Sequence, residues 1–233
     1  MGRVIMSGIV PTLKAPVTYK ANFADNTWAQ IIDACHKNKV PATWAVGNQK
    51  TMTINGTAYT IDIIGKNHDT YVNGGKAPLT FQLHDCYGKT KNMNSSNTNS
   101  GGWTSCAMRQ THLPAILALM PTEVQNGIRE VNKLASAGNK STTINTTADK
   151  LFLLSEVEIF GSVTYSKSGE GTQYDYYTGN SKVKKFNGSA RNWWERSPHG
   201  SDPARFCSVD GDGNAGIAYA ASGAFGVAFA FCF

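Results

Sequence analysis

Few residues in this 233-residue chain have the types and spacing that chemistry requires. The run Asp210-x-Asp212-x-Asn214 begins like a calcium-binding loop. The twelfth position of such a loop needs a carboxylate, and here it is Ala221. We therefore predict a β-turn at this run and no metal site.

Three other groups of titratable residues do not form a catalytic pattern. His68 and Asp69 lie in an expected polar turn after a strand, where both residue types are common. The run His84-Asp85-Cys86 resembles a hydrolase set in composition alone. Glu156 and Glu158 stand two residues apart at an expected helix start, so their side chains should not converge. No phosphate-binding glycine loop or dinucleotide fingerprint occurs. We predict a protein that is not an enzyme and carries no cofactor.

Charge and composition narrow the classes of partner. The chain has a formal net charge of +6, but only 16% of its residues are charged. Its densest basic group, Lys182, Lys184 and Lys185, has no basic helix or aromatic RNA-binding motif beside it, so we predict no nucleic-acid partner. The surplus of uncharged polar residues is typical of loop-rich proteins that contain β-structure.

Cysteine usage and targeting signals bear on location. Five widely spaced cysteines do not suggest a disulfide framework, so we expect buried, reduced thiols and folding in a cytoplasm. No signal peptide is evident, because Pro11, Lys14 and Pro16 interrupt any apolar stretch near the start. No apolar run is long enough for membrane insertion. A protein that acts outside the cell would then leave by another route, such as lysis.

The N-terminal part should contain one short helix and a hairpin. Residues 1–43 are predicted to form an irregular arm followed by a helix capped by Asp25 or Asn26, serving attachment or oligomerisation. Residues 50–54 and 58–64 alternate around Asn55-Gly56, which predicts a β-hairpin.

The remainder should be short elements separated by polar loops. A strand is expected at 79–83, an irregular loop at 92–102, a buried helix near 116–120 and an exposed helix at 123–134. Further along the chain we expect a return loop at 136–147, a buried strand at 151–154, a capped helix start at 155–158, a short helix or turn at 169–177, and strands that begin at Trp193-Trp194 and end within 226–233.

Three stretches together resemble a known family. They are Trp44-Ala-Val-Gly-Asn48 with the hairpin and Ile64-Gly-x-Asn67-His68-Asp69 after it, then Leu151-Phe-Leu-Leu-Ser-Glu-Val-Glu158, and finally Trp193-Trp-Glu-Arg-Ser-Pro198 with Asp210-Gly-Asp-Gly213 and Gly226-Val-Ala-Phe229. Over residues 44–233 the chain resembles bacterial and phage proteins with a C-type-lectin-like, formylglycine-generating-enzyme-like fold. Some members are variable proteins of diversity-generating retroelements.

The resemblance implies an α+β, loop-rich C-type-lectin-like fold, with short helices around small mixed or antiparallel sheets. It does not carry over the catalytic cysteine pair, because the flanks of Cys207 and Cys232 do not match that chemistry. Cys232 is expected in the core. Trp193 and Trp194 should point to opposite faces of a strand, one buried and the other covering a second surface.

The resemblance also implies a test within the sequence. In retroelement-diversified proteins, template adenines are mutagenised, mainly in AAC or AAT codons, and the resulting codons cannot encode Lys, Glu, Gln, Trp or Met. The chain has 39 residues of these five types, and none lies in the 37 residues 197–233, where about seven would be expected. A terminal segment rich in Gly and Ala could also lack them through composition alone.

These observations predict a receptor-binding protein with a diversified C-terminal surface at about 191–225, such as a phage tail or fibre-tip protein. Its scaffold would be Trp193, Trp194, Pro198, Phe206, Gly226 and the strand that follows. The candidate ligand-binding positions are Arg191, His199, Ser201, Asp202, Ala204, Arg205, Ser208, Asp210, Asp212, Asn214, Ile217, Tyr219, Ser222, Ala224 and Phe225.

The expected partners are a host-cell surface protein or glycan, a virion component to which the chain attaches, and possible further copies of itself. The expected location is the virion, in a phage tail, or the cell exterior after cytoplasmic synthesis. Two alternatives are an undiversified structural or adhesion module of a phage particle and a formylglycine-generating-type enzyme.

Overall fold

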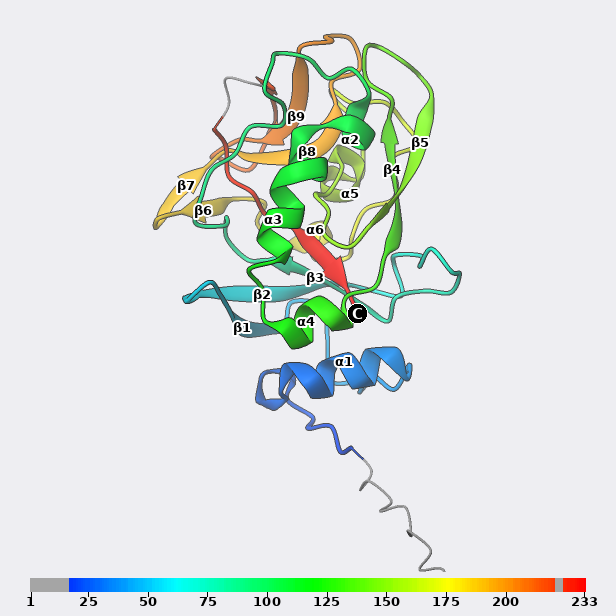
Figure 1. Cartoon of the computed structure of the whole chain (residues 1–233), viewed down its shortest axis with the longest axis vertical. Coiled ribbons are helices and arrows are strands. Elements are labelled where there is room, and N and C mark those ends of the chain that lie inside the picture. Colours follow the sequence, from blue (N-terminus) through cyan, green and yellow to red (C-terminus); the bar gives the residue numbers. More distant parts are fainter. Residues whose placement is uncertain (1–16, 221–223) are drawn as a thin grey trace, which may run out of the picture.

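A computed structural model describes residues 17–220 and 224–233, in which two small antiparallel sheets occupy opposite halves (Figure 1). One sheet has the order β1 (Gln49–Ile54), β2 (Thr57–Lys66), β3 (Leu79–Leu83) and β11 (Ala230–Cys232). The other has the order β10 (Ala215–Tyr219), β9 (Arg205–Val209) and β8 (Trp193–Pro198). Two separate hairpins are β4 (Val131–Ser136) with β5 (Ile144–Asp149), and β6 (Lys184–Phe186) with β7 (Ser189–Arg191).

Short helical segments pack around these strands. They are η1 (Phe23–Asp25), α1 (Trp28–His36), α2 (Gly102–Ser105), the π-helical turn η2 (Met108–His112), α3 (Leu113–Leu117), α4 (Thr122–Gly127), α5 (Glu156–Phe160) and α6 (Tyr176–Gly179). The predicted α+β class with short helices and small antiparallel sheets is confirmed. None of the helices in the described residues has the length and apolar character needed to cross a bilayer.

The four-stranded sheet follows from local sequence signals. Asn55 and Gly56 both have positive φ, 47° and 78°, which is the backbone that a two-residue hairpin of this hand requires. β1 and β2 then pair in continuous register from Ile54↔Thr57 to Gln49↔Asp62. The predicted strands at 50–54, 58–64 and 79–83 are confirmed, and the terminal β11 completes the sheet beside β3.

Helix α1 covers this sheet and belongs to the same core. Its cap is Thr27 in a capping box with Gln30, rather than the predicted Asp25 or Asn26. The ring of Trp28 lies 6.2 Å from that of Phe81 and 6.0 Å from that of Phe233. The helix in the N-terminal region therefore shares apolar packing with the last residue of the chain. Residues 1–16 of the predicted arm lie outside the described residues, and its attachment role stays a prediction.

Three predictions for the middle of the chain were wrong. The exposed helix expected at 123–134 ends at Gly127, and residues 131–136 form β4 instead. The expected return loop at 136–147 contains most of β5, which pairs with β4. Residues 151–154 are buried as expected but form no strand, and only Phe152 makes an isolated bridge, to Ala230. The capped helix start at Ser155 is confirmed, with its capping box.

Candidate functional site

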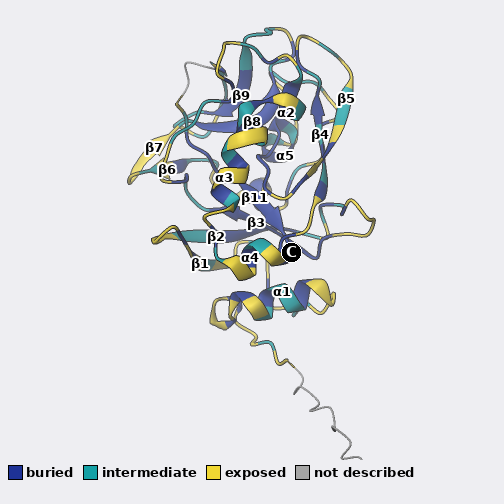
Figure 2. Cartoon of the chain, in the orientation of Figure 1, coloured by how far each residue is buried: buried dark blue, intermediate teal, exposed yellow. Residues whose placement is uncertain are grey.

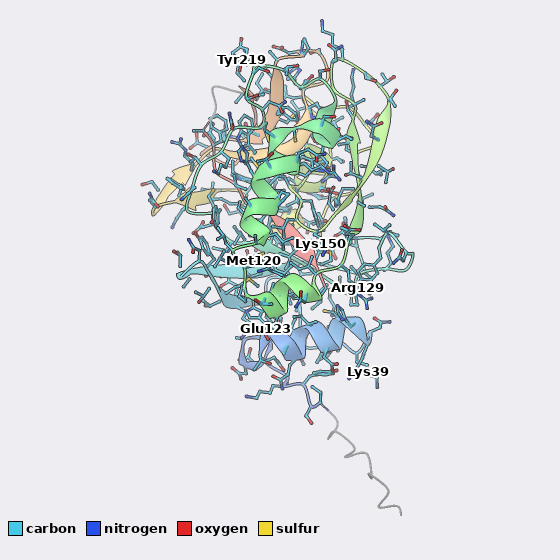
Figure 3. All side chains as sticks on the ribbon, viewed as in Figure 1. Lys39, Met120, Glu123, Arg129, Lys150 and Tyr219 are labelled. Atoms are coloured by element: carbon cyan, nitrogen blue, oxygen red, sulfur yellow. The ribbon has the colours of Figure 1, made fainter. Side chains whose placement is uncertain are left out.

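The predicted ligand-binding positions gather at the end of the molecule that carries the three-stranded sheet. Of the fourteen that the structure describes, thirteen are exposed or half-buried. They are Arg191, His199, Ser201, Asp202, Ala204, Arg205, Asp210, Asp212, Asn214, Ile217, Tyr219, Ala224 and Phe225. Tyr219 lies at the opposite end from Lys39 and α1 (Figures 1 and 3). Ser222 lies outside the described residues.

Ser208 is the exception and corrects the prediction. It is 1% exposed, because β9 is the central strand of its sheet and both of its faces are covered between Phe206 and Val209. Its hydroxyl has no hydrogen-bond partner among the described residues. Ser208 therefore cannot present its side chain to a ligand.

The hairpin between β9 and β10 is closed by a side-chain-stabilised turn. The Asp210 carboxylate accepts the backbone N–H groups of Asp212 at 2.9 Å and Asn214 at 2.8 Å, and Gly213 supplies the positive φ of 87°. The predicted β-turn is confirmed. No group of His, Cys, Asp and Glu in the part of the chain described here is placed to hold a metal ion.

The loop from residue 199 to 204 is held from below by Asn99. Its amide nitrogen donates to the carbonyl oxygens of Asp202 at 3.0 Å and Arg205 at 2.8 Å, and Asn99 is fully buried. Within the loop, His199 Nδ1 accepts the N–H groups of Ser201 and Asp202. Burial lowers the pKa of His199. These bonds fix the backbone of the loop, and the side chains of His199 and Asp202 take part in fixing it.

Sequence reasoning missed Asn99 and one aromatic neighbour. Asn99 lies in the polar run 92–102, where no local signal separates it from the other asparagines. Tyr165 stacks on His199 with ring centroids 5.8 Å apart, although it is distant in sequence and had no motif around it.

Arg205 and Tyr219 form the principal aromatic and cationic group of the surface. The guanidinium lies 4.1 Å from the centroid of the tyrosine ring, and its Nε donates to Asp202 Oδ2 at 2.9 Å. The Ala204 N–H and the Arg205 cation lower the pKa of Asp202, so its carboxylate is held in the charged form. Tyr219 remains 42% exposed. Aromatic rings and arginine are the residue types that carry most interface energy.

The other rim of the surface rests partly on the core. Arg191 donates to the carbonyl oxygen of Ala224 at 2.8 Å. Phe225 is half-buried and stacks on Trp194, with centroids 4.7 Å apart. One face of the Phe225 ring is therefore used in packing, and Tyr219 is the freer of the two predicted aromatic anchors.

Strand β8 supports the surface and is buried along its whole length (Figure 2). Both Trp193 and Trp194 are fully buried, so the expectation that one indole covers a second surface was wrong. Their indole N–H groups donate to the carbonyl oxygens of Lys182 and Lys91. The predicted scaffold residues Pro198, Phe206 and Gly226 are buried as well.

Beneath β8 lies a buried network of charges that the sequence did not indicate. Arg196 pairs with Glu158, its Nη2 lying 2.8 Å from Oε1. Lys133 Nζ bridges Glu158 Oε1 at 2.7 Å and Asp69 Oδ1 at 2.8 Å, and the Tyr174 hydroxyl donates to Asp69. Asp69 is thus buried in the core, not in the ordinary polar turn that was expected.

The network keeps its carboxylates ionised. Burial disfavours the charged forms of Asp69 and Glu158, but Lys133 beside the first and Arg196 and Lys133 beside the second hold both pKa values below their usual range. Glu158 converges with cations from β4 and β8, while Glu156 accepts the N–H groups of Tyr165 and Ser166. Glu156 and Glu158 do not converge on each other, as predicted. Each instead binds buried or backbone partners that hold the structure together.

Two further buried acids, Glu195 and Glu170, have raised pKa values instead of lowered ones. No donor among the described residues lies within hydrogen-bonding distance of either carboxylate oxygen of Glu195, which is fully buried. Burial and the neighbouring Glu156 and Glu170 raise the pKa of Glu195 well above its usual range. Burial also raises the pKa of Glu170 to about 7, against a hydrogen bond donated by Ser197.

Other titratable side chains are not among the predicted ligand-binding positions. His84 pairs with Asp62 at 2.8 Å, beside a hollow of about 250 Å³ that Lys184 also lines. Lys184 donates to the carbonyl oxygens of Leu83 and His84, and burial lowers its pKa to about 8. All five cysteines are buried, free thiols. Burial raises the pKa of Cys207 and Cys232 well above the usual value, which disfavours nucleophilic thiolates there.

Residues 68–233 match the model of a family described as a domain of unknown function, DUF6273, and the chain belongs to this family. The matched range begins beside Asp69 and ends with the chain, so it includes the buried charge network, β8 and the candidate surface. No curated protein and no solved structure matches the chain.

Proposed function

We propose that this DUF6273 member is a ligand-binding protein that presents a diversified recognition surface on a fixed scaffold, as a receptor-binding component of a phage tail or fibre tip. We define the recognition surface as the exposed or half-buried predicted positions from His199 to Tyr219. The ligand would be a protein or glycan on a host cell. The proposal includes the C-type-lectin-like fold and the retroelement-driven variation that the sequence resemblance implies.

One observation carries the proposal. The segment that lacks Lys, Glu, Gln, Trp and Met begins at residue 197, directly after the buried run Trp193-Trp194-Glu195-Arg196. From residue 197 on, buried stretches such as β9 and β11 alternate with exposed or half-buried positions, and the predicted positions among these lie at the end of the molecule that carries the three-stranded sheet. The segment that lacks these five residue types contains all the predicted positions from His199 onward, together with buried residues such as 226–233. Targeted variation would leave this deficit at the outward positions.

The small stability cost of substitutions at exposed positions also supports the proposal. Substitutions at exposed positions away from caps and cores usually change stability by less than about 0.5 kcal/mol. The backbone of the 199–204 loop is fixed by buried Asn99, which precedes the depleted segment, so side chains in that loop can change without losing this clamp. A rigid support with replaceable loops is the arrangement in which binding residues commonly lie.

The geometry also suggests how the molecule would be oriented. α1 lies at the end opposite Tyr219, which leaves the recognition surface facing away from a carrier that holds the N-terminal region (Figure 3). The alternative of a formylglycine-generating-type enzyme receives no specific support, since Cys207 and Cys232 are both buried. An undiversified adhesion module would share the fold but would not vary between copies of the gene.

Binding by a double variant tests the proposal. Purified, fluorescently labelled Arg205→Ser/Tyr219→Ser protein should lose at least about tenfold in affinity for bacterial cells that bind the wild type, because it removes the central cation and ring. The matched control is Lys39→Ser/Leu119→Ser, which removes a cation and a side chain of similar exposure, 43% against 42%, elsewhere on the molecule. Equal binding by the wild type and a folded Arg205→Ser/Tyr219→Ser variant would place the ligand site elsewhere.

A further inference from the structure

The recognition surface contains an open sheet edge. β10 is the outer strand of the order β10-β9-β8, and within residues 17–220 and 224–233 no strand pairs with its far side. The edge runs from Ala215 to Tyr219, between the Asp210 turn and the Arg205–Tyr219 pair. Open edges are templates for a further strand.

The register identifies which backbone groups this edge presents. Asn214 accepts the N–H of Asp210, and Ala220 donates to the carbonyl oxygen of Ala204, so the even-numbered residues of β10 face β9. In an antiparallel pair the residues between them point their N–H and C=O groups the other way. Ala215, Ile217 and Tyr219 therefore each direct one donor and one acceptor outward along the free edge.

Nothing within β10 blocks this edge. Proteins usually protect open edges with charged side chains, proline or a bulge. β10 has the sequence Ala-Gly-Ile-Ala-Tyr, and its register with β9 is continuous. One outer strand of the other sheet, β1, carries Lys50 by contrast.

We propose that β10 binds an extended segment of a protein ligand by strand addition, within the recognition surface and therefore resting on its proposed function. Main-chain hydrogen bonds would supply affinity that does not depend on which side chains the variable positions carry. Tyr219 and Arg205 beside the edge would supply specificity, as side chains do in other strand-addition complexes. Affinity from the main chain would let a diversified site keep part of its binding energy for a ligand when its side chains are replaced.

The alternating donors and acceptors favour a peptide over a glycan. Strand residues two apart repeat at about 6.6 Å along the edge, and another strand matches this spacing with its own backbone. A glycan would contact the side chains of the surface and would not require the outward N–H of Ile217. Glycan binding independent of that N–H is accordingly the outcome that opposes the proposal.

Proline at position 217 isolates the backbone contribution. Ile217→Pro removes the outward N–H without removing a bond to β9, and proline is tolerated on such edges. Gly216 precedes it, so the usual restriction on the residue before proline is small. The matched control, Ile217→Ala, removes most of the side chain and keeps the N–H. Ala218→Pro should destabilise the hairpin, because the N–H of Ala218 faces β9.

The probes are a displayed library of random linear peptides, selected on the wild-type protein, and a glycan array. We expect selected peptides to bind Ile217→Pro at least about tenfold more weakly, equivalent to about 1.4 kcal/mol, and Ile217→Ala less than about threefold more weakly. Peptides that bind Ile217→Pro as they bind the wild type would overturn strand addition. Strand addition would also be overturned if the protein bound glycans on the array and no peptide were selected from the library.

Two further readouts separate the possible failures. If Arg205→Ser/Tyr219→Ser abolishes binding and Ile217→Pro does not, the recognition surface stands and strand addition fails. If neither variant changes binding, both proposals fail. Should Ile217→Pro unfold, amide hydrogen exchange on the wild type decides instead: the amides of Ile217 and Tyr219 should gain protection on peptide binding, whereas Ala218 should be protected throughout. No gain at Ile217 and Tyr219 would overturn the proposal.

Discussion

Strands β8 and β10 are the two outer strands of one sheet, yet their environments are opposite. Every residue of β8 is buried, while every residue of β10 is half-buried or exposed. The far edge of β8 is closed, because Trp194 donates to the carbonyl oxygen of Gly226 and Arg196 to that of Leu154. No described strand pairs with the far edge of β10.

The difference shows how one sheet can combine rigidity with tolerance. β8 contains two indoles and Arg196, which pairs with Glu158 of α5. Glu158 in turn pairs with Lys133 of β4, so changes in β8 disturb several elements at once. β10 contains mostly small side chains. Ala218 packs partly against the core, and Tyr219 pairs with Arg205 of β9 across the hairpin. β9 pairs with both strands and so joins the buried β8 to the exposed hairpin. The predictions below test this contrast, from the strand where effects should be large to the one where they should be small.

The largest effect is expected at Arg196. Replacing it with methionine leaves the Glu158 carboxylate buried with only Lys133 opposite, and breaking such a pair typically costs about 3–5 kcal/mol. Urea unfolding followed by circular dichroism measures the loss. In the control, Arg196→Met/Glu158→Leu, much of the stability should return, because no unpaired charge remains. A single variant within about 1 kcal/mol of the wild type would show that the network is not a structural anchor.

An intermediate and pH-dependent effect is expected at Glu195. Its raised pKa means that the folded state keeps a proton that the unfolded state loses above about pH 4.5, so stability should fall as the pH rises from there. Glu170, with its pKa raised to about 7, acts in the same direction between about pH 4.5 and 7. Asp69 and Glu158, whose pKa values are lowered, act oppositely but only in more acidic solution.

Glu195→Gln should therefore stabilise the protein at pH 8 and have little effect near pH 4, because the amide has no proton to lose on unfolding. Unfolding free energies of the variant and the wild type, measured across this range, give the comparison. Parallel pH profiles for the two proteins would mean that Glu195 carries its charge in the folded state, contrary to its apolar and acidic surroundings.

The smallest effect on stability is expected at the recognition surface. Arg205→Ser/Tyr219→Ser should change the free energy of unfolding by no more than about 1 kcal/mol in total, since both residues are accessible. Phe225→Ser should cost more, because its ring stacks on Trp194. A double variant as unstable as Arg196→Met would make this hairpin part of the core and remove the contrast between the two strands.

The sequence predicted elements that depend on local signals. The Asn55-Gly56 hairpin and the Ser155 capping box are encoded by residues next to one another, and both are present. β4 was missed because Lys133, in its centre, reads as a solvent-exposed helical residue. Its burial is explained only by Asp69 and Glu158, which lie 64 and 25 residues away.

For the candidate surface, the structure bears only on the exposure of the predicted positions, and their role in binding stays a prediction. Residue types and the missing five amino acids located the outward positions, but they could not distinguish Ser208 from its exposed neighbours. That distinction depends on β9 being the central strand, covered on both faces, which is a property of the assembled sheet. Asn99 and Tyr165 were missed because their contacts with the 199–205 segment join distant parts of the chain.

The most direct test of a diversified surface on a fixed scaffold is deep sequencing of this gene in a culture grown from a single cell of the strain that carries it. We predict substitutions at adenine-containing codons, concentrated at the outward positions between residues 191 and 225. Codons for Trp193, Trp194 and residues 226–233 should remain unchanged. Substitutions that are absent from the window, or spread evenly along the gene, would contradict the account.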